Sequence, residues 1–301
     1  EPLKQSLGGN QITKVSGIIN GTTNYILSRM DKEGVNYAEV LKDAQSLGYA
    51  ESDPAADVEG SDAADKIAIL SGLAFGGAIN RAKIPTTGIN LLEAIDVNYA
   101  RKLGYGIKLL AISEKEETQS KSESSQPLSV WVEPTLVPED NPLAGVNGVN
   151  NAILVEGNPI GQVMFFGPGA GSGPTASAVV ADILNIAGIL SMNEDKIFNL
   201  DPLLSAKSWR NCHLAEEKQI TKKNYIRLIA KDSPGVIGEI GTIFGQKKIS
   251  IESIVQFDAT DEEAEIVVIT HKIKQGQLEE ALLDIEKLSQ VKRIAAKMGC
   301  L

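Results

Sequence analysis

Two kinds of apolar pattern, short runs and a helical spacing, predict the strands and helices in the first two hundred residues of the chain. Short apolar runs predict strands at 11–19, 106–113, 128–132, 151–156 and 161–166. Apolar residues three and four positions apart predict helices at 21–30, 36–48, 61–76, 90–103 and 175–186. Strands that follow one another along the chain favour an antiparallel or mixed sheet with the earlier helices on one face. We therefore expect an α+β fold for this region.

A different order of elements begins at Asn224. The pattern predicts strand, helix, two strands, helix and strand at 225–231, 236–246, 249–257, 264–273, 276–288 and 291–297. This βαββαβ order is that of a ferredoxin-like fold. Residues 201–221 lack hydrophobic periodicity, so we expect one domain at 1–204, a linker at 205–223 and a second domain at 224–301.

The stretch from Gly48 to Gly76 combines an acidic loop with an amphipathic helix. Five acidic residues precede one lysine: Glu51, Asp53, Asp57, Glu59 and Asp62 come before Lys66. The Asp53-Pro54 pair and Gly60 argue against regular structure in the first half of the stretch. Ser61 is a plausible N-cap for the helix that follows. Asp62 and Lys66 are four residues apart, so a carboxylate and an ammonium share one helix face.

Several carboxylates around one lysine suit a small zwitterion that carries a free ammonium group. The carboxylates would bind the ammonium, and the lysine would meet a hydroxyl or a carboxylate. A lysine in such a site can also transfer protons. The alternative is a solvated acidic loop with a routine ion pair at a helix start, because charge runs are usually surface.

Composition narrows the possible partners. A net charge of -10 argues against nucleic acid or an anionic membrane as a partner, and no apolar run approaches the ~18 residues of a membrane span. Cys212 and Cys300 have no paired spacing, which fits a reducing, cytoplasmic compartment. His213 and His271 lie far in sequence from the acidic stretch, so no metal site is expected. The polar segment 114–126 predicts an exposed or disordered loop.

A glycine-rich stretch, GPGAGSG at 167–173, lies between an expected strand and an expected helix. That context is typical of the dinucleotide fingerprint G-x-G-x-x-G. The spacing differs, because Pro174 occupies the position at which a third glycine would follow Gly169 and Gly171, and no Walker A lysine is present. The stretch by itself therefore gives little support for a phosphate contact.

Two long segments carry a resemblance to homoserine dehydrogenase: VSGIINGTTNYILSRM at 15–30 and the acidic stretch at 48–76. The similarity extends from the first residues to about Leu204. It implies a catalytic domain that binds homoserine and dimerises through its sheet, with a mixed sheet and helices on one face. It also implies a preceding Rossmann domain that binds NAD or NADP. Glu1-Pro2-Leu3-Lys4 resembles the point at which the family chain leaves that domain.

The resemblance implies a role for each matched residue. Lys66 would transfer the hydroxyl proton of the substrate. The amino acid would be held by residues of both segments: Gly21, Thr22, Tyr49, Glu51, Asp57 and Asp62. Gly169 and Gly171 would lie against the nicotinamide end of the cofactor, with the helix after Pro174 packed on the Rossmann domain. The family's second catalytic lysine and the carbonyls that bind a monovalent cation would lie upstream of this chain.

The turn DSPGV at 232–236, together with the βαββαβ order, resembles an ACT domain. Such domains bind amino-acid effectors near this turn, commonly between two copies. Free backbone N–H groups in the turn suit a carboxylate, and Asp232 can accept from an ammonium. The resemblance implies effector contacts at Asp232, Gly235, Val236 and Ile251, with threonine as the first candidate. The alternative is a dimerisation module without a ligand.

The sequence therefore predicts the C-terminal portion of an NAD(P)-dependent homoserine dehydrogenase of threonine, methionine and isoleucine biosynthesis. It would interconvert L-homoserine and L-aspartate 4-semialdehyde, form a homodimer or a higher homo-oligomer, and be inactive without the Rossmann domain. The competing hypothesis is a non-catalytic amino-acid-binding protein, built from an inactive remnant and an ACT domain. Every matched position carries a chemically suitable residue, which argues against that alternative.

Overall fold

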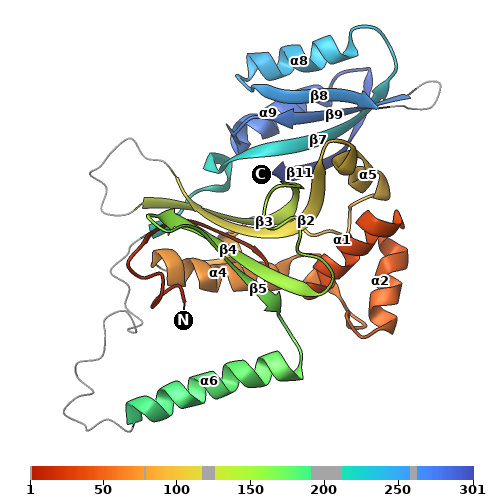
Figure 1. Cartoon of the computed structure of the whole chain (residues 1–301). Coiled ribbons are helices and arrows are strands. Elements are labelled where there is room, and N and C mark those ends of the chain that lie inside the picture. Colours follow the sequence, from red (N-terminus) through yellow and green to blue (C-terminus); the bar gives the residue numbers. More distant parts are fainter. Residues whose placement is uncertain (1, 78, 117–125, 191–211, 258–262) are drawn as a thin grey trace.

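The computed structural model describes residues 2–77, 79–116, 126–190, 212–257 and 263–301. Its strands form one eleven-stranded sheet in the order β5-β4-β1-β2-β3-β11-β7-β9-β8, while β6 pairs with β3 and β10 with β7 (Figure 1). The strands of the first half are β1 (Gln11–Ile18), β2 (Tyr105–Lys115), β3 (Gln126–Pro138), β4 (Asn150–Asn158) and β5 (Gly161–Pro168). Those of the second half are β6 (Cys212–Leu214), β7 (Thr221–Lys231), β8 (Ile251–Phe257), β9 (Glu263–Thr270), β10 (Ile273–Lys274) and β11 (Val291–Cys300).

Helices cover one face of the first half of the sheet, as the sequence predicts. The helices that contact these strands are α1 (Gly21–Glu33), α4 (Ser61–Phe75) and α5 (Ala94–Lys102). α2 (Tyr37–Ser46) packs on α1, and the short α3 (Ala55–Val58) packs on α1 and α4. Successive side chains of a strand point to opposite faces, so Leu110 and Ile112 of β2 belong to a second apolar cluster. There they join Trp131 of β3 and cover Leu143 and Val146 from the segment after β3.

The second half confirms the βαββαβ order. β7, β8, β9 and β11 pair antiparallel, and α8 (Val236–Gln246) and α9 (Gln275–Ile285) pack against one another and against these strands. Apolar residues of α8, α9 and the strands form one cluster, which includes Ile240, Phe244 and Leu278. This half is therefore a ferredoxin-like unit with its own core.

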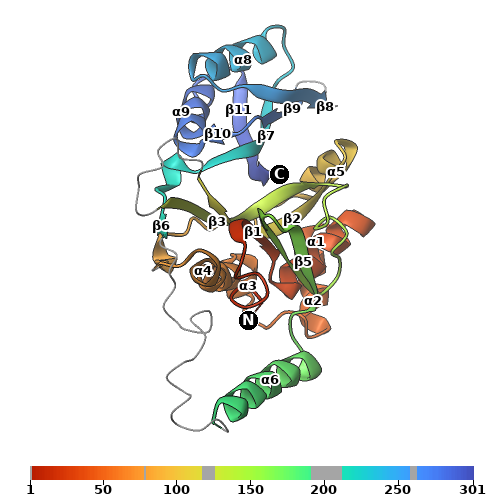
Figure 2. The same ribbon diagram turned by 60° about the vertical axis from the view of Figure 1, so that its left-hand side comes forward.

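The two halves are joined edge to edge. β11 pairs in parallel with β3, and the partners are Gly299 with Thr135 and Cys300 with Leu136. A Cβ added at Gly299 would lie 2.5 Å from the Glu133 carboxylate, so a larger residue there would require the Glu133 side chain to move. The expected two domains therefore share one sheet, and Figure 2 shows this from a second direction.

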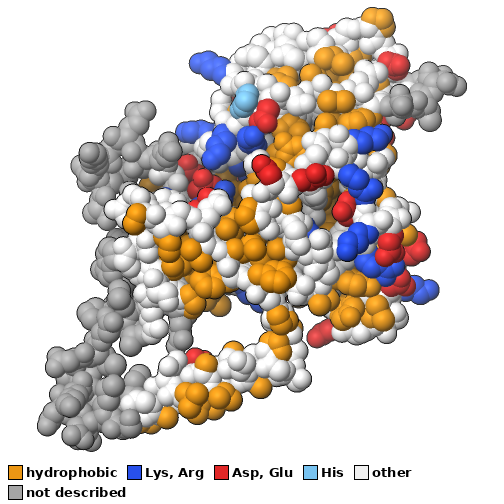
Figure 3. Space-filling view, in the orientation of Figure 1, with side chains coloured by type: hydrophobic (Ala, Val, Ile, Leu, Met, Phe, Trp, Pro, Cys, Tyr) orange, Lys and Arg blue, Asp and Glu red, His pale blue; other side chains and the backbone are white. Residues whose placement is uncertain are grey.

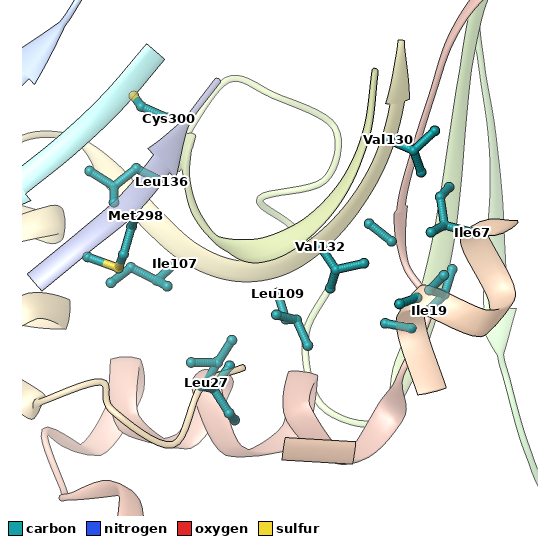
Figure 4. Close-up of a cluster of buried hydrophobic side chains, with 14 of the residues drawn as sticks. Ile19, Leu27, Ile67, Ile107, Leu109, Val130, Val132, Leu136, Met298 and Cys300 are labelled. Atoms are coloured by element: carbon teal, nitrogen blue, oxygen red, sulfur yellow. The ribbon is translucent and has the colours of Figure 1, made fainter. Parts of the chain in front are cut away.

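One apolar core crosses the junction between the halves. Figure 4 shows Ile67 of α4 at one end of the cluster and Met298 of β11 at the other, with Leu109 of β2 and Val132 of β3 between them. All four side chains are at most 4 % exposed. The two halves therefore exclude water jointly along the shared edge.

A buried ion network also joins the halves. Arg227 of β7 donates from Nε to Asp96 Oδ1 of α5 at 2.6 Å, and it also pairs with Glu93 and with Glu265, the latter at 3.1 Å. The side chains of Arg227 and Asp96 are 1 % and 0 % exposed. Burial raises the pKa of Asp96, and the hydrogen bond from Arg227 opposes that rise. Tyr99 of α5 stacks on Phe257 of β8 beside this network, with ring centroids 4.0 Å apart.

The start of one helix, the cap of another and one short helix differ from what was expected. The helix expected from Asn90 begins at Ala94, because Glu93 and Asp96 form a capping box at its start. Gly60, rather than Ser61, is the N-cap of α4, and its φ of +85° is one that glycine adopts without strain. The acidic loop contains the short helix α3, which was not expected. Asn36 precedes α2, as predicted, but its side chain makes no capping hydrogen bond.

The helix α6 (Ser172–Leu190) lies apart from the sheet in both ribbon views (Figures 1 and 2). Its exposed apolar side chains include Val179, Ile183 and Leu184, and Figure 3 shows hydrophobic side chains along it.

None of the described helices is long and apolar enough to cross a membrane. Residues 205–211 of the expected linker and residues 117–125 of the polar segment 114–126 lie outside the described residues. Within the expected linker, β6 pairs in parallel with the start of β3.

Candidate functional site

The candidate site lies where β1 ends and α1 begins. Asn20 is the N-cap of α1, with an extended backbone and a side-chain oxygen that accepts from Thr23 N at 2.9 Å. Asparagine is among the preferred residues at this position, because its side chain satisfies a free N–H of the first turn. The next residue, Gly21, lies so close to the segment before β4 that an added Cβ would be 2.9 Å from Val149 O. Glycine is therefore required for this approach.

The acidic stretch meets this turn through Asn20. Its amide nitrogen donates to Asp57 Oδ1 at 2.6 Å and to Asp62 Oδ2 at 3.0 Å. Asp57 lies on α3 and Asp62 in the first turn of α4, so one side chain links three helix ends. The sequence analysis did not identify Asn20 as a site residue. The amide type and its position before a helix gave no indication of the two carboxylates.

Lys66 lies beside the two carboxylates. Its Nζ donates to Asp62 Oδ2 at 2.7 Å and to the backbone oxygen of Ile19 at 3.0 Å. The predicted shared face of Asp62 and Lys66 is therefore occupied by an ion pair. The Lys66 side chain remains 47 % exposed, so its third proton can reach a ligand. A lysine held in this way can exchange a proton with a nearby hydroxyl.

The remaining predicted substrate residues are only partly brought together. Thr22 Oγ1 donates to the backbone oxygen of Tyr49 at 2.7 Å, which ties α1 to the loop after α2. The Tyr49 ring packs against Tyr25, with centroids 4.9 Å apart. Glu51 is exposed, and no donor within the described residues bonds its carboxylate. The substrate role of Glu51 therefore stays a prediction.

A cavity of about 490 Å³ opens beside Lys66. Its walls come from β1, α4, β4 and β5, and they include Ile69, Phe165, Phe166, Asn151 and Gly169. The cavity therefore places the predicted proton-transfer lysine and the first predicted cofactor glycine on one surface. Gly171 is not part of its wall, but its φ of +117° is strained for other residues.

Asn151 is a second polar residue of the site that sequence reasoning missed. An added Cβ at Gly169 would lie 1.9 Å from Asn151 Nδ2, so glycine at 169 has a packing reason as well as any ligand role. The buried Oδ1 of Asn151 has no hydrogen-bond partner within the described part of the chain. Asn151 therefore brings an unsatisfied acceptor to the wall of this cavity.

Phe165 and Phe166 form an apolar part of the cavity wall beside Gly169, and an apolar wall of this kind suits the flat face of an aromatic ring such as nicotinamide. The glycine-rich stretch 167–173 does not have the glycine spacing of the dinucleotide fingerprint G-x-G-x-x-G. The residues present therefore fit one end of a dinucleotide and leave most of it to other groups. No group of three His, Cys, Asp or Glu residues in the described ranges could hold a metal ion.

The turn after β7 lines a separate cavity of about 540 Å³. Asp232, Gly235 and Val236 lie on its wall, and Gln256 Nε2 donates to Asp232 Oδ1 at 3.2 Å. Ile251 lies outside this wall, because it stands at the start of β8 while the cavity lies near the end of that strand. Its effector contact stays a prediction. Gln256 is the β8 residue that takes part, and the sequence pattern gave no reason to choose it.

Comparison with known proteins identifies both halves. The homoserine dehydrogenase family profile matches residues 1–184, and the ACT domain profile matches residues 224–290. The homoserine dehydrogenase of Synechocystis sp. is 51% identical over 98% of this chain and 67% of its own length. A solved homoserine dehydrogenase from Thiobacillus denitrificans has a TM-score of 0.90 at 36% identity, covering 100% of this chain and 66% of its own. A hyperthermophilic archaeal homoserine dehydrogenase mutant, solved with NADPH, has a TM-score of 0.50 at 29% identity, covering 68% of this chain and 53% of its own. The chain thus spans about two thirds of the length of the first two relatives.

Proposed function

The chain belongs to the homoserine dehydrogenase family, and from that premise we propose that it supplies the substrate-binding, proton-transfer and regulatory parts of an NAD(P)-dependent homoserine dehydrogenase. The observation that carries the proposal is the position of Lys66. Its Nζ bonds Asp62 and Ile19 O at the wall of the cavity that Gly169 also lines. Proton transfer and hydride transfer must occur at one carbon and its oxygen, so both groups have to face one space.

We propose that the reaction interconverts L-homoserine and L-aspartate 4-semialdehyde. When bound, the dinucleotide supplies the hydride acceptor for the oxidation. Lys66 exchanges the hydroxyl proton at its Nζ, while Asp62 and Ile19 O hold that nitrogen in place. Asp57 and Asp62 orient the ammonium of the amino acid. The apolar side chains of Phe165 and Phe166 limit the access of water to the nicotinamide ring. Positioning of this kind supplies a large part of the rate in such transfers.

We propose that the chain alone binds substrate but does not transfer hydride. Gly169 and the neighbouring aromatic residues reach one end of a dinucleotide. The remaining contacts would come from the Rossmann domain that the family resemblance implies. Oxidation of NADPH in the presence of aspartate 4-semialdehyde should be negligible for this chain. It should appear when the chain is joined to the nucleotide-binding domain of a relative.

The same joined protein with Lys66→Ala is the control for contaminating dehydrogenase, since it keeps both domains. Turnover by the unjoined chain at the level of a complete dehydrogenase would contradict the proposal. It would mean that these residues build a complete cofactor site of their own.

We also propose a regulatory role for the cavity at the DSPGV turn. The cavity combines the carboxylate of Asp232 with the free N–H groups at the start of α8, and these two features suit the two charged ends of an amino acid. Threonine is the first candidate. A homodimer, formed through the sheet and through paired ACT domains, would complete such a site.

Asp232→Ala should remove most of the calorimetric heat of threonine binding, because the ammonium loses its charge partner. The titration should use the whole chain, since β11 pairs with β3 and the ACT half shares a core with the rest. Asp140→Ala, at an exposed position in the segment after β3, is the matched control. Equal heats from Asp232→Ala and the unchanged chain would leave the ACT half as a dimerisation module.

A further inference from the structure

We propose that Asn20 is a positioning residue for the amino-acid substrate, and that it fixes Asp57 and Asp62 as a two-carboxylate cradle for the substrate ammonium. This inference rests on the proposed function, because the ammonium belongs to the proposed substrate. It assigns a role to a residue at which the sequence pattern showed only a helix start.

The Asn20 side chain uses all of its hydrogen-bonding capacity within the site. Its oxygen accepts from Thr23 N at 2.9 Å and from Thr23 Oγ1 at 3.0 Å. Its nitrogen carries two hydrogens, and these match the two contacts at 2.6 Å and 3.0 Å to Asp57 and Asp62. The residue is 6 % exposed. Its amide is therefore held in one orientation by α1 and directed at both carboxylates.

The contacts bring two like charges close together and keep an acceptor free on each. Both carboxylates accept from the same nitrogen, so their bonded oxygens lie within two hydrogen-bond lengths of one another. No donor in the described ranges reaches Asp57 Oδ2 or Asp62 Oδ1. An ammonium has three donors and a positive charge, so it complements two carboxylates that each keep one oxygen unengaged.

The same arrangement connects the cradle to Lys66. Asp62 Oδ2 accepts from Asn20 Nδ2 at 3.0 Å and from Lys66 Nζ at 2.7 Å. A shift of Asn20 would therefore move the ammonium-binding carboxylates and the proton-transfer group together. This geometry distinguishes Asn20 from an ordinary cap, whose loss would affect only the start of α1.

Asn20→Asp separates the capping of α1 from the orientation of the Asp57 and Asp62 carboxylates. Aspartate caps a helix as well as asparagine does, so the bond from Thr23 N is retained. It cannot donate to Asp57 and Asp62, and it adds a third negative charge beside them. Asn20→Ala removes both roles. Asn80→Ala is the matched control, because Asn80 caps the short 3-10 helix at Arg81–Lys83 through Ala82 N at 3.0 Å and is exposed.

The first measurement is binding of L-homoserine and of 4-hydroxybutanoate to the full chain by calorimetry. The second compound lacks the ammonium but keeps the carboxylate and the hydroxyl. Asn20→Asp and Asn20→Ala should each weaken homoserine binding by about tenfold or more, with a much smaller change for 4-hydroxybutanoate. Asn80→Ala should bind both as the unchanged chain does.

The second measurement needs no ligand. Hydrogen exchange at the amides of Asp57, Val58 and Glu59 should be faster in Asn20→Asp and Asn20→Ala than in Asn80→Ala, because α3 has lost its link to α1. Normal homoserine binding and normal exchange in Asn20→Asp would overturn the role of Asn20 and leave it as a cap. If the unchanged chain, joined to a nucleotide-binding domain, neither bound nor oxidised homoserine, the proposed substrate would be wrong, and the exchange result would still decide whether Asn20 holds the acidic stretch.

Discussion

Replacing Lys66 by alanine in the enzyme joined to a nucleotide-binding domain is expected to lower kcat by about 10² to 10⁴ while KM for homoserine changes only a few-fold. The reason is that Lys66 Nζ lies in the cavity wall and is held by Asp62 and Ile19 O. Asp57 and Asp62 remain to bind the amino acid and Asn20 remains to position them, so ground-state binding is retained. The interaction that is lost develops as the hydroxyl proton moves.

Two further variants make this prediction specific. Lys66→Arg keeps a positive charge beside Asp62 but cannot exchange a proton near neutral pH, so it should be nearly as slow as Lys66→Ala. Lys42→Ala, at an exposed position of α2, should leave kcat and KM unchanged. If Lys66→Arg restored kcat, the charge rather than proton transfer would be the contribution of this residue. An unchanged kcat in Lys66→Ala would make the ion pair with Asp62 structural.

Replacing Arg227 by methionine is expected to lower the free energy of unfolding by about 3–5 kcal/mol, the range seen when one partner of a buried pair is removed. Asp96 is fully buried, and without the guanidinium it would have to remain charged without its partner or take up a proton. The measurement is urea unfolding at neutral pH, followed by circular dichroism. The loss should exceed that of any single surface ion pair in this chain.

A double variant and a surface control distinguish the loss of the buried Arg227–Asp96 pair from a nonspecific disruption of the junction between the two halves. Arg227→Met combined with Asp96→Leu should recover part of the loss, because apolar replacement of a whole buried pair is often neutral or better. Arg293→Met is the matched control, since Arg293 is 55 % exposed and lies 3.9 Å from the Glu93 carboxylate. It should change stability by less than about 0.5 kcal/mol. Equal effects of Arg227→Met and Arg293→Met would show that the network contributes no more than surface charge.

The periodic parts of the fold could be predicted from the sequence, and the reason is local. Strand and helix periods depend on neighbours a few positions away, so β1, β4, β5 and the βαββαβ order were expected and are confirmed. Helix starts were less predictable, because a capping box at Glu93 and a left-handed Gly60 displaced the expected caps at Asn90 and Ser61. When several polar residues lie near a helix start, the backbone geometry of the turn decides which of them caps the helix, and the sequence pattern does not give that geometry.

Contacts between distant segments could not be predicted from the pattern. The pairing of β3 with β11 joins residues more than 160 positions apart, and nothing in either strand's alternation indicates a partner. Arg227 appeared to belong to an ordinary strand, although it lies among three carboxylates from two other elements. Asn20 and Asn151 were missed for the same reason, because the hydrogen-bond partners of Asn20 and the close neighbour of Asn151, Gly169, come from other parts of the chain. The resemblance to a family supplied Lys66, Asp57 and Asp62 but did not indicate what positions them.

The shared sheet limits how the proposed effector site could be removed from this chain. Deleting the ACT half would expose the backbone edge of the last part of β3. There the backbone oxygen of Leu136 accepts from Leu301 N, and Leu136 pairs with Cys300. It would also remove Met298 from the core that reaches α4. A truncated protein would expose a strand edge of the kind that templates aggregation. To remove the effector response proposed for the DSPGV turn, point substitutions at that turn should therefore be preferred to a truncation, because they keep the second half of the sheet intact.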